Sequence, residues 1–373
     1  MVGGGIVGLA TARELLSRSP GMALAVLERE REVGLGQTTW NSGVVHAGIY
    51  YPPGSLKAKL CVEGARALYS YCDEHGIRAE RSGKLIIATS EHELAGLDEL
   101  ERRGRANGVP GLRRLRGDEI AAVEPHARGI AALHSPATGI VDFAAVARAL
   151  RADVEAAGAV VMTGCEVVAI EHGSSSVALT HSRGVLQAHR ALFCAGAAAD
   201  RLAVLDGGDS DPRIVPFRGA YVKLRRPELV RSMIYPVPDP QLPFLGVHLT
   251  RHASGDVLIG PTALLVPHAR SLAWPGTWRM MRRHWRSGLT ELHHAIWRRA
   301  LVAAARRFVP QLRDSDVERA FTGVRAQALA RDGSLVDDFA FSGDGTTLHV
   351  RNAPSPAATS SLAIAGYIAD RFG

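Results

Sequence analysis

The sequence predicts a mixed α/β fold, in which a nucleotide-binding domain is interleaved along the chain with a second domain built on an antiparallel sheet. Three observations predict it. They are a glycine-rich loop at the start, an alternation of predicted strands and helices after it, and a run of short predicted strands near the middle. We see no internal repeat and no low-complexity linker.

The composition is that of a globular protein. The chain of 373 residues is long enough for two domains of about 150 residues each. With 46% hydrophobic and 22% charged residues, it is not disordered throughout. No apolar run reaches the ~18 residues of a membrane-spanning helix. No basic segment precedes the first apolar run, so we expect no secretory signal.

Charge and cysteine usage narrow the class of partner. The net charge is +7, and almost all cations are arginine, because lysine occurs only at positions 57, 59, 84 and 223. This surface favours anionic partners, but nucleic acid is excluded because no recognition module surrounds the basic residues. The four cysteines form no CxxC and no zinc spacing. We expect reduced thiols in a cytoplasmic bacterial protein without a metal site.

The first element is a glycine-rich loop, G-x-G-x-x-G on Gly3, Gly5 and Gly8. An amphipathic helix follows it, and then a buried strand at Ala23–Leu27 that ends at Glu28. The glycines allow a tight turn and close backbone approach to a pyrophosphate, which the helix N-terminus stabilises. The acid accepts hydrogen bonds from a ribose. Together these features predict a dinucleotide site.

Only Met1 and Val2 precede this loop, whereas the motif normally follows a buried strand of about five residues at the centre of the sheet. We therefore expect that the first strand is truncated and that the true start lies upstream.

Hydrophobic periodicity predicts the remaining elements. Helices are expected at 91–107, at 143–157 with Asp142 as N-cap, at 276–309 with a break at Ser287-Gly288, and at 361–371. Strands are expected at 84–88, 160–162, 167–170, 177–180, 191–194, 215–224, 243–249 and 347–351.

With these elements placed, the chain resembles the FAD-dependent D-amino-acid-oxidase-like superfamily, and within it the L-2-hydroxyglutarate dehydrogenase (oxidase) family. The matching stretches follow one another over nearly the whole chain. They are Asn41–Pro53, Leu56–Cys61, Ser82–Leu85, Pro216–Gly219, Ile234–Pro240, Leu242–Arg251, Gly323–Gln327, Asp332–Phe339 and Asn352–Thr359.

The resemblance implies oxidation of L-2-hydroxyglutarate to 2-oxoglutarate by hydride transfer to FAD, with a membrane quinone or oxygen as the electron acceptor. It implies a discontinuous Rossmann-like FAD-binding domain (1–80, 136–214 and 320–373). The substrate domain (81–135 and 215–319) would place its sheet over the flavin. Besides the glycine loop and Glu28, the residues that it assigns to FAD are Asn41, Ser42, Gly43, Val167, Ala195, Gly196, Asn352, Ala353, Pro354 and Ser355.

The chemistry of a 2-hydroxy dicarboxylate requires a base and two cations. Histidine is the usual base near neutral pH. His46 is one candidate base, and it lies in a second glycine-rich stretch, after the predicted strand Ala23–Leu27. His248 is the other candidate base. Arg325 matches the superfamily position that grips a substrate carboxylate, and a bidentate guanidinium suits that task. Further candidate anchors are Arg251, Arg218 and Lys57.

The sequence departs from the family pattern at Gly36, where relatives have His, at Ala220, where they have Glu, and at Thr262, where they have Asn. The segment 265–285 is also shorter than in relatives. Two alternatives stay open: an amine-oxidising relative of the glycine or sarcosine oxidase kind, and a non-catalytic FAD-binding remnant.

The segment 274–307 stands out, because it holds four of the five tryptophans and eight arginines against the single acid Glu291. An apolar stripe recurs at helical spacing at positions 278, 281, 285, 289, 292 and 296. Such a helix either packs its stripe inward or lies in a lipid headgroup layer. We favour inward packing, and keep peripheral contact with the inner face of the cell membrane as the alternative.

Overall fold

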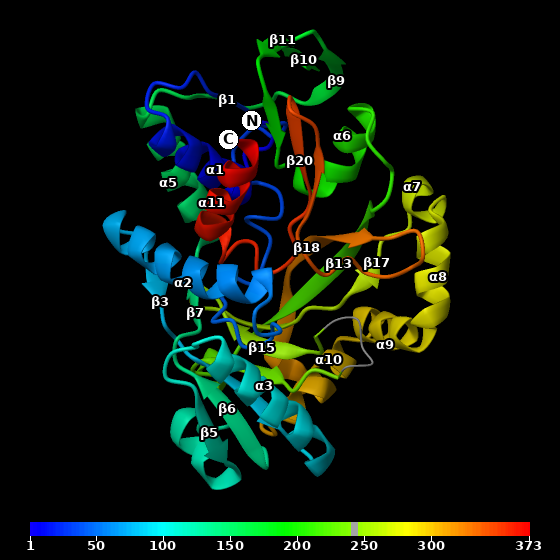
Figure 1. Cartoon of the computed structure of the whole chain (residues 1–373). Helices are drawn as coiled ribbons and strands as arrows, with labels where there is room; N and C mark the ends of the chain where they lie inside the picture. The colour runs from blue at the N-terminus through cyan, green and yellow to red at the C-terminus, as the bar shows by residue number, and fades with distance from the viewer. Residues whose placement is uncertain (240–244) are drawn as a thin grey trace.

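The computed structural model describes residues 1–239 and 245–373 (Figure 1). The N- and C-termini lie close together in one half of the molecule, and a large sheet occupies the other half. The mixed α/β class predicted from the sequence is confirmed. The domain boundaries given above stay a prediction.

The first half is built on a parallel sheet. β1 (Ala25–Leu27) pairs with β8 (Val160–Met162), while β12 (Ala191–Phe193) pairs with β20 (Thr347–Asn352), which also pairs antiparallel with β19 (Ala340–Gly343). Val2 joins the two parts through parallel bridges to Leu27 and Phe193. Its N–H donates to Leu192 O at 2.8 Å, and its carbonyl accepts from the Cys194 N–H at 2.8 Å. The central position of this sheet is therefore occupied by residues at the start of the chain.

Helices cover this sheet. They are α1 (Ile6–Arg18), α2 (Leu56–Glu74), α5 (Phe143–Ala156) and α11 (Ser361–Phe372), with the short α6 (Ala199–Leu205) near β20. Asp142 caps α5 as predicted, because its side chain accepts from the Ala144 N–H at 2.9 Å. A Cβ at Gly64 of α2 would lie 2.5 Å from Ser360 Cα, so glycine allows α2 to cross the start of α11 closely.

Two small antiparallel sheets flank this half. One contains β9 (Val167–His172), β10 (Val177–His181) and β11 (Gly184–Ala188). The other contains β2 (Val44–Val45), β7 (Gly139–Val141) and β3 (Ala79–Glu80). β2 leads directly into the loop that carries His46.

The second half is the large sheet. In spatial order its strands are β17 (Leu264–Leu265), β13 (Arg213–Leu224), β16 (Val257–Gly260), β15 (His248–Arg251), β14 (Met233–Pro236), β4 (Lys84–Ala88), β6 (Ala131–Ser135) and β5 (Arg113–Arg116). The long β18 (Val317–Leu329) also pairs with β13. Neighbouring strands are antiparallel except β14 and β4, which run parallel. The predicted strand at 243–249 begins outside the described residues, and its described part enters β15.

The two faces of this sheet have different surroundings. Leu85, Ile234 and Leu249 point to one face, into a core that includes Leu301 and Val302 of α10 (Arg298–Arg306). Because side chains alternate along a strand, Lys84, Tyr235 and His248 point to the other face. There the neighbouring Ile86 packs against residues 44–49 of the first half. The helices α3 (Leu94–Ala106) and α4 (Ile120–Val123) complete the outer end.

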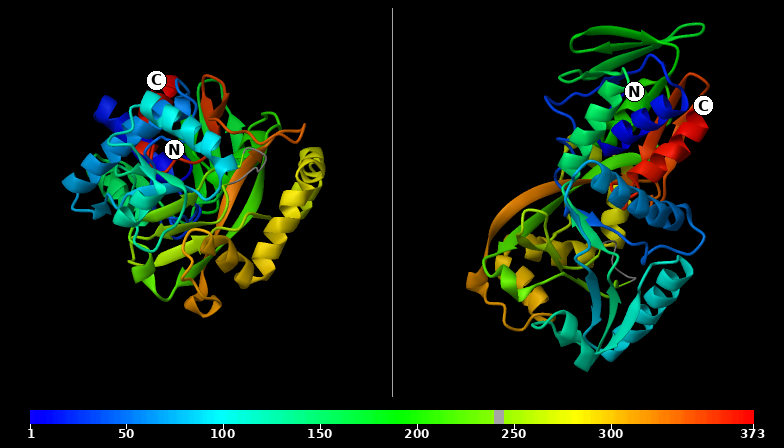
Figure 2. Two further views of the ribbon diagram at one scale, coloured as in Figure 1. Left: turned by 90° about the horizontal axis from the view of Figure 1, so that it is seen from below. Right: turned by 90° about the vertical axis from the view of Figure 1, so that its left-hand side faces the viewer.

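The segment 269–306 differs from prediction. It forms α7 (Ala269–Leu272), α8 (Pro275–Arg283), α9 (Trp285–Ile296) and α10. The breaks fall at His284 and Trp297, and Ser287-Gly288 lies inside α9, so the predicted break position was wrong. The prediction that the apolar stripe packs inward was also wrong, because all its residues from Trp278 to Ile296 are exposed. α8 and α9 form an outer edge of the molecule (Figure 2).

Candidate active site

The glycine loop is shaped to receive a phosphate. Gly3 has φ +108°, and a Cβ there would lie 2.4 Å from Cys194 O. A Cβ at Gly8 would lie 2.0 Å from Gly3 O. Both glycines are therefore required by the backbone packing. A Cβ at Gly5 would meet only Thr38 Oγ1, at 3.5 Å, so the space beside the start of α1 is open to a ligand.

Glu28 is fixed at the end of β1. Its Oε2 accepts from the Gly4 N–H at 2.6 Å, and its Oε1 accepts from the Glu30 N–H at 2.8 Å. Each carboxylate oxygen has a second lone pair, so this buried acid can still accept from ribose hydroxyls. The turn at Ala195-Gly196 lies beside Gly3, and Gly196 has φ +52°. Val167 packs in the same core as Val2 and Leu27.

The predicted FAD residues at 41–43 shape their own loop. Asn41 Nδ2 donates to Thr38 O at 2.7 Å, and Asn41 Oδ1 accepts from the Gly43 N–H at 2.7 Å. Gly43 has φ +70° and no room for a Cβ beside Val141 O. Ser42 hydrogen-bonds to Tyr221 of the large sheet, which connects the two halves of the molecule.

The predicted FAD residues at 352–355 begin the loop before α11. Asn352 Nδ2 donates to Val336 O at 2.9 Å and to Asp338 O at 2.8 Å, so it holds the loop that carries Asp337. Ala353 and Pro354 follow it, and Ser355 hydrogen-bonds to Tyr51.

FAD fits these residues. The open space at Gly5 and the carboxylate of Glu28 suit its pyrophosphate and ribose. At the start of α11, the hydroxyls of Ser360 and Ser361 are buried without a hydrogen-bond partner within 1–239 and 245–373. Buried hydroxyls without a partner are unfavourable, and polar atoms of a bound group can satisfy them.

His46, His248 and Lys84 come together between the two halves. Burial, followed by the effects of Lys84 and His248, holds the pKa of His46 well below its usual 6.5. Its Nδ1 is buried and has no hydrogen-bond partner in the described part of the chain. Burial lowers the pKa of His248 to about 4. His248 Nδ1 lies 2.9 Å from Gly246 O, so Nδ1 carries the proton and Nε2 is the free acceptor. Both imidazoles are neutral at pH 7.

Arg325 lies on the same side of the large sheet, further along it. Asp337, Tyr51 and Tyr221 are within electrostatic reach of its guanidinium. Lys57, also predicted as an anchor, is buried and pairs with Asp337 (Nζ to Oδ1, 2.8 Å). Because Asp337 already neutralises Lys57, this lysine is a weaker anchor for an incoming carboxylate than the sequence suggests.

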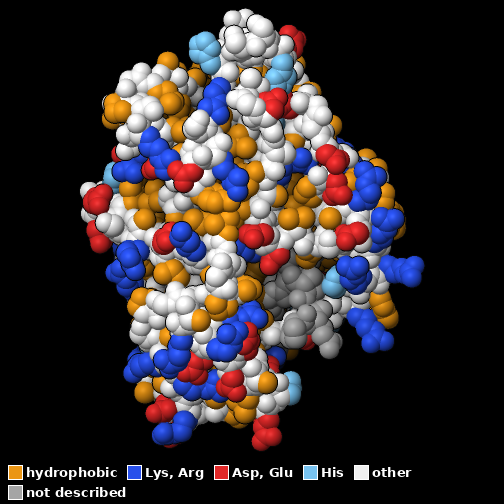
Figure 3. All heavy atoms as spheres, in the orientation of Figure 1, with side chains coloured by type: hydrophobic (Ala, Val, Ile, Leu, Met, Phe, Trp, Pro, Cys, Tyr) orange, Lys and Arg blue, Asp and Glu red, His pale blue; other side chains and the backbone are white. Residues whose placement is uncertain are grey.

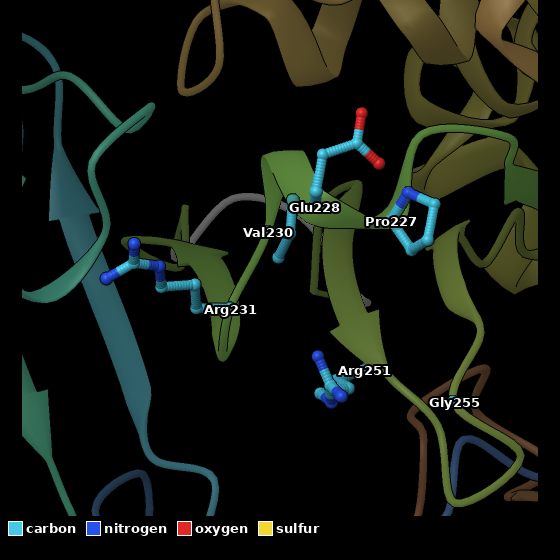
Figure 4. A pocket seen from close by; sticks show the side chains of 6 residues that line it. All are labelled: Pro227, Glu228, Val230, Arg231, Arg251 and Gly255. Atoms are coloured by element: carbon cyan, nitrogen blue, oxygen red, sulfur yellow. The ribbon is translucent and has the colours of Figure 1, made fainter.

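The structure does not bring Arg218 and Arg251 to this site. Arg218 stands opposite Val324, and its neighbour Phe217 stands opposite Arg325, so Arg218 and Arg325 point to opposite faces. Arg251 is three residues past His248 on β15 and points away from it for the same reason. It lines a separate surface pocket of about 320 Å³ with Pro227, Glu228, Val230, Arg231 and Gly255 (Figure 4).

Sequence reasoning missed Lys84, Tyr50, Tyr221 and Tyr235. A signal existed for the lysine, because it begins the otherwise apolar strand Lys84–Ala88, where a cation is costly. Tyr221 and Tyr235 gave no such signal, since tyrosine is common in ordinary strands, and Tyr50 lies in a loop with no distinctive pattern around it.

Comparison with known proteins agrees with this geometry. The model of the family "FAD dependent oxidoreductase" matches residues 1–371. The mitochondrial L-2-hydroxyglutarate dehydrogenase of Homo sapiens is 44% identical, over 99% of this chain and 87% of that protein. The L-2-hydroxyglutarate dehydrogenase of Indibacter alkaliphilus is 41% identical, over 99% of this chain and 97% of that protein.

The chain belongs to the FAD-dependent oxidoreductase family. Within it, the chain is a member of the L-2-hydroxyglutarate dehydrogenase group, as the resemblance predicted. Its cofactor is FAD.

Solved structures agree on the fold. L-α-glycerophosphate oxidase from Mycoplasma pneumoniae with FAD bound superposes with a TM-score of 0.82 at 24% identity, covering 100% of this chain and 93% of that chain. Glycine oxidase from Geobacillus kaustophilus superposes with a TM-score of 0.72 at 21% identity, covering 99% of this chain and 92% of that chain. At these identities the likeness extends to the fold alone.

Proposed function

We propose that this chain oxidises L-2-hydroxyglutarate to 2-oxoglutarate. The observation that carries the proposal is that the neutral His46, in the loop after β2, lies within electrostatic reach of the neutral His248, on the sheet face that also carries Arg325. Oxidation removes a proton from the substrate hydroxyl and a hydride from its carbon. Bound FAD supplies the acceptor for the hydride. The chain supplies a base, orientation and positive charge.

His46 is the proposed base. A neutral imidazole whose Nδ1 has no hydrogen-bond partner among residues 1–239 and 245–373 can accept the hydroxyl proton. His248, with Nδ1 held by Gly246 O, presents Nε2 and is the rival. Arg325 is the proposed anchor for one carboxylate, since its planar fork matches a carboxylate bidentately.

The deciding experiment is anaerobic bleaching of the holoenzyme's flavin across a panel of substrates. We expect bleaching by L-2-hydroxyglutarate, and slower or no bleaching by D-2-hydroxyglutarate, L-lactate, glycine and sarcosine. Faster bleaching by glycine or sarcosine would favour an amine oxidase instead. A yellow protein that no member of the panel bleaches would favour the non-catalytic alternative.

We also propose that the chain contacts a lipid surface through α8 and α9. In α9 every described side chain keeps solvent contact, and Trp285, Leu289 and Ile296 are 56%, 57% and 61% exposed. Arginines project from the same edge (Figure 3). Tryptophans beside arginines suit an anionic headgroup layer. Among residues 1–239 and 245–373, no helix combines the length and the hydrophobicity of a membrane-spanning segment.

Contact of α8 and α9 with a lipid surface supports a quinone in the lipid as the electron acceptor, with oxygen as the alternative. It also supports a cytoplasmic enzyme located at the inner face of the membrane. Flotation with phosphatidylglycerol-containing vesicles tests it. Trp285→Gln with Ile296→Gln should abolish binding, while Val185→Gln, which removes an equally exposed apolar residue from β11, should not. Equal binding of all variants, or self-association through this edge in sedimentation, would overturn the proposal.

A further inference from the structure

Lys84 is a buried cation in the middle of the candidate site. It begins β4, directly after Gly83, whose φ of +79° forms the turn into the strand. Only 1% of Lys84 is exposed. It lies on the same face as Tyr235 and His248, which places its ammonium between the large sheet and the His46 loop.

The groups that face this ammonium come from four elements, and all of them are neutral at pH 7. They are Cys61 of α2, His46 and Tyr50 of the loop after β2, Tyr235 of β14 and His248 of β15. Burial raises the pKa of Cys61 and of Tyr235 to about 12, and that of Tyr50 well above 10.0.

The ammonium makes cation–π contacts with two aromatic rings. Lys84 Nζ lies 3.9 Å from the ring centroid of Tyr235 and 5.2 Å from that of Tyr50. No hydrogen bond or ion pair to Nζ is formed within residues 1–239 and 245–373. Cation–π contacts stabilise a cation only partly. An unpaired buried charge is strongly unfavourable, so Lys84 keeps its proton only where an anion lies against it and otherwise tends to lose it.

We propose that Lys84 binds a carboxylate of the dicarboxylate substrate, as the second cationic anchor beside Arg325. The inference rests on the proposed function. Tyr221 lies within electrostatic reach of both Arg325 and Tyr235, and Tyr235 contacts Lys84, so the two cations belong to one continuous site. A dicarboxylate carries one charge at each end, which is why the substrate requires two cations. Lys84 would thus serve as the second carboxylate anchor in place of Arg218 and Arg251, whose side chains point away from the site.

The assignment has a consequence that a structural lysine would not have. Burial lowers the pKa of Lys84 to about 7 in the ligand-free chain. A carboxylate against the ammonium restores the charged form, so its pKa rises on binding. Above pH 7 each bound dicarboxylate therefore takes up close to one proton, and its Kd rises by about tenfold per pH unit.

The test uses the FAD-loaded full chain and 2-oxoglutarate, which binds without reducing the flavin. Titration calorimetry at pH 8, in buffers with different heats of ionisation, measures the protons taken up. Perturbation of the flavin spectrum gives Kd from pH 6.5 to 9. We expect uptake near one proton in the wild type. In Lys84→Met we expect no uptake and a Kd raised by tenfold or more.

Lys223→Met is the matched control, because Lys223 lies at the surface and pairs with Asp256. It should keep the wild-type Kd and proton uptake. The pH series on the wild type tests whether Lys84 binds a carboxylate even if the Lys84→Met protein loses FAD. A flat Kd between pH 6.5 and 9 with no proton uptake would overturn the assignment of Lys84 alone. Failure to bind 2-oxoglutarate or to be bleached by L-2-hydroxyglutarate would instead overturn the proposed function.

Discussion

The backbone N–H of His46 donates a hydrogen bond to Thr359 Oγ1 at 3.1 Å, although 313 residues separate the two along the chain. The same hydroxyl donates to Val44 O at 3.2 Å. Thr359 lies just before α11, and α2 crosses this point closely at Gly64. The loop that carries the proposed base is therefore held by the C-terminal part of the chain.

This contact predicts that Thr359→Val impairs both stability and catalysis. Valine keeps the shape of the side chain but leaves the partly buried N–H of His46 without this acceptor, and loss of a hydrogen-bond partner costs up to about 1–3 kcal/mol. We expect a lower melting temperature and slower flavin reduction. Thr290→Val on exposed α9 is the control and should change neither. A variant that melts earlier yet reduces flavin at the wild-type rate would show that Thr359 does not position His46.

Replacement of the two histidines separates their roles. We expect His46→Ala to slow flavin reduction by about 10²–10⁴-fold while FAD stays bound, since removal of a general base costs that much. Stopped-flow absorbance of the flavin measures it. Loss of FAD would reassign His46 to cofactor binding. If reduction is unchanged in His46→Ala but slow in His248→Ala, His248 is the base.

Arg325→Lys tests the first carboxylate anchor. Lysine keeps the charge but cannot make the bidentate contact, so we expect KM for L-2-hydroxyglutarate to rise by about tenfold or more. Arg218→Lys serves as comparison, because Arg218 points to the opposite face of the sheet. Steady-state kinetics with a dye acceptor give both values. Equal kcat/KM in Arg325→Lys and the wild type would remove Arg325 from the site.

The elements predicted correctly are those whose signals are local. The glycine loop, Asp142 and the strand Lys84–Ala88 lie within a few residues of the features that identify them, and the structure places them as expected. α2 was not among the predicted helices, although its buried residues Cys61, Gly64, Leu68 and Cys72 recur at helical spacing.

The candidate site was predicted only in part, because it is made by pairing distant segments. β13 meets β18 across about a hundred residues, and this register alone decides that Arg325 and Arg218 face opposite ways. The residue pattern of each strand alone does not determine the register between β13 and β18. Nor could the sequence show that the apolar stripe on α9 is exposed, since an inward and an outward stripe have the same periodicity.

The last prediction concerns the stability cost of Lys84. A buried ammonium without a counter-ion destabilises the ligand-free fold. Exchange of even paired buried charges for apolar residues of similar volume is often neutral or stabilising by about 1–4 kcal/mol. Lys84→Met should therefore unfold at higher denaturant concentration than the wild type in the absence of 2-oxoglutarate.

The pH dependence follows from the direction of the shift. Burial lowers the pKa of Lys84 from 10.5 to about 7 in the folded state. Between these values the unfolded chain binds the proton that the folded chain has released, so wild-type stability rises with pH. The gain in the free energy of unfolding of Lys84→Met over the wild type should be largest at pH 7 and below and should shrink toward pH 10. Urea titrations at pH 6.5, 8 and 9.5, with Lys223→Met beside them, measure this. A Lys84→Met protein that is less stable than the wild type at every pH would show that the aromatic contacts of Lys84 outweigh its desolvation.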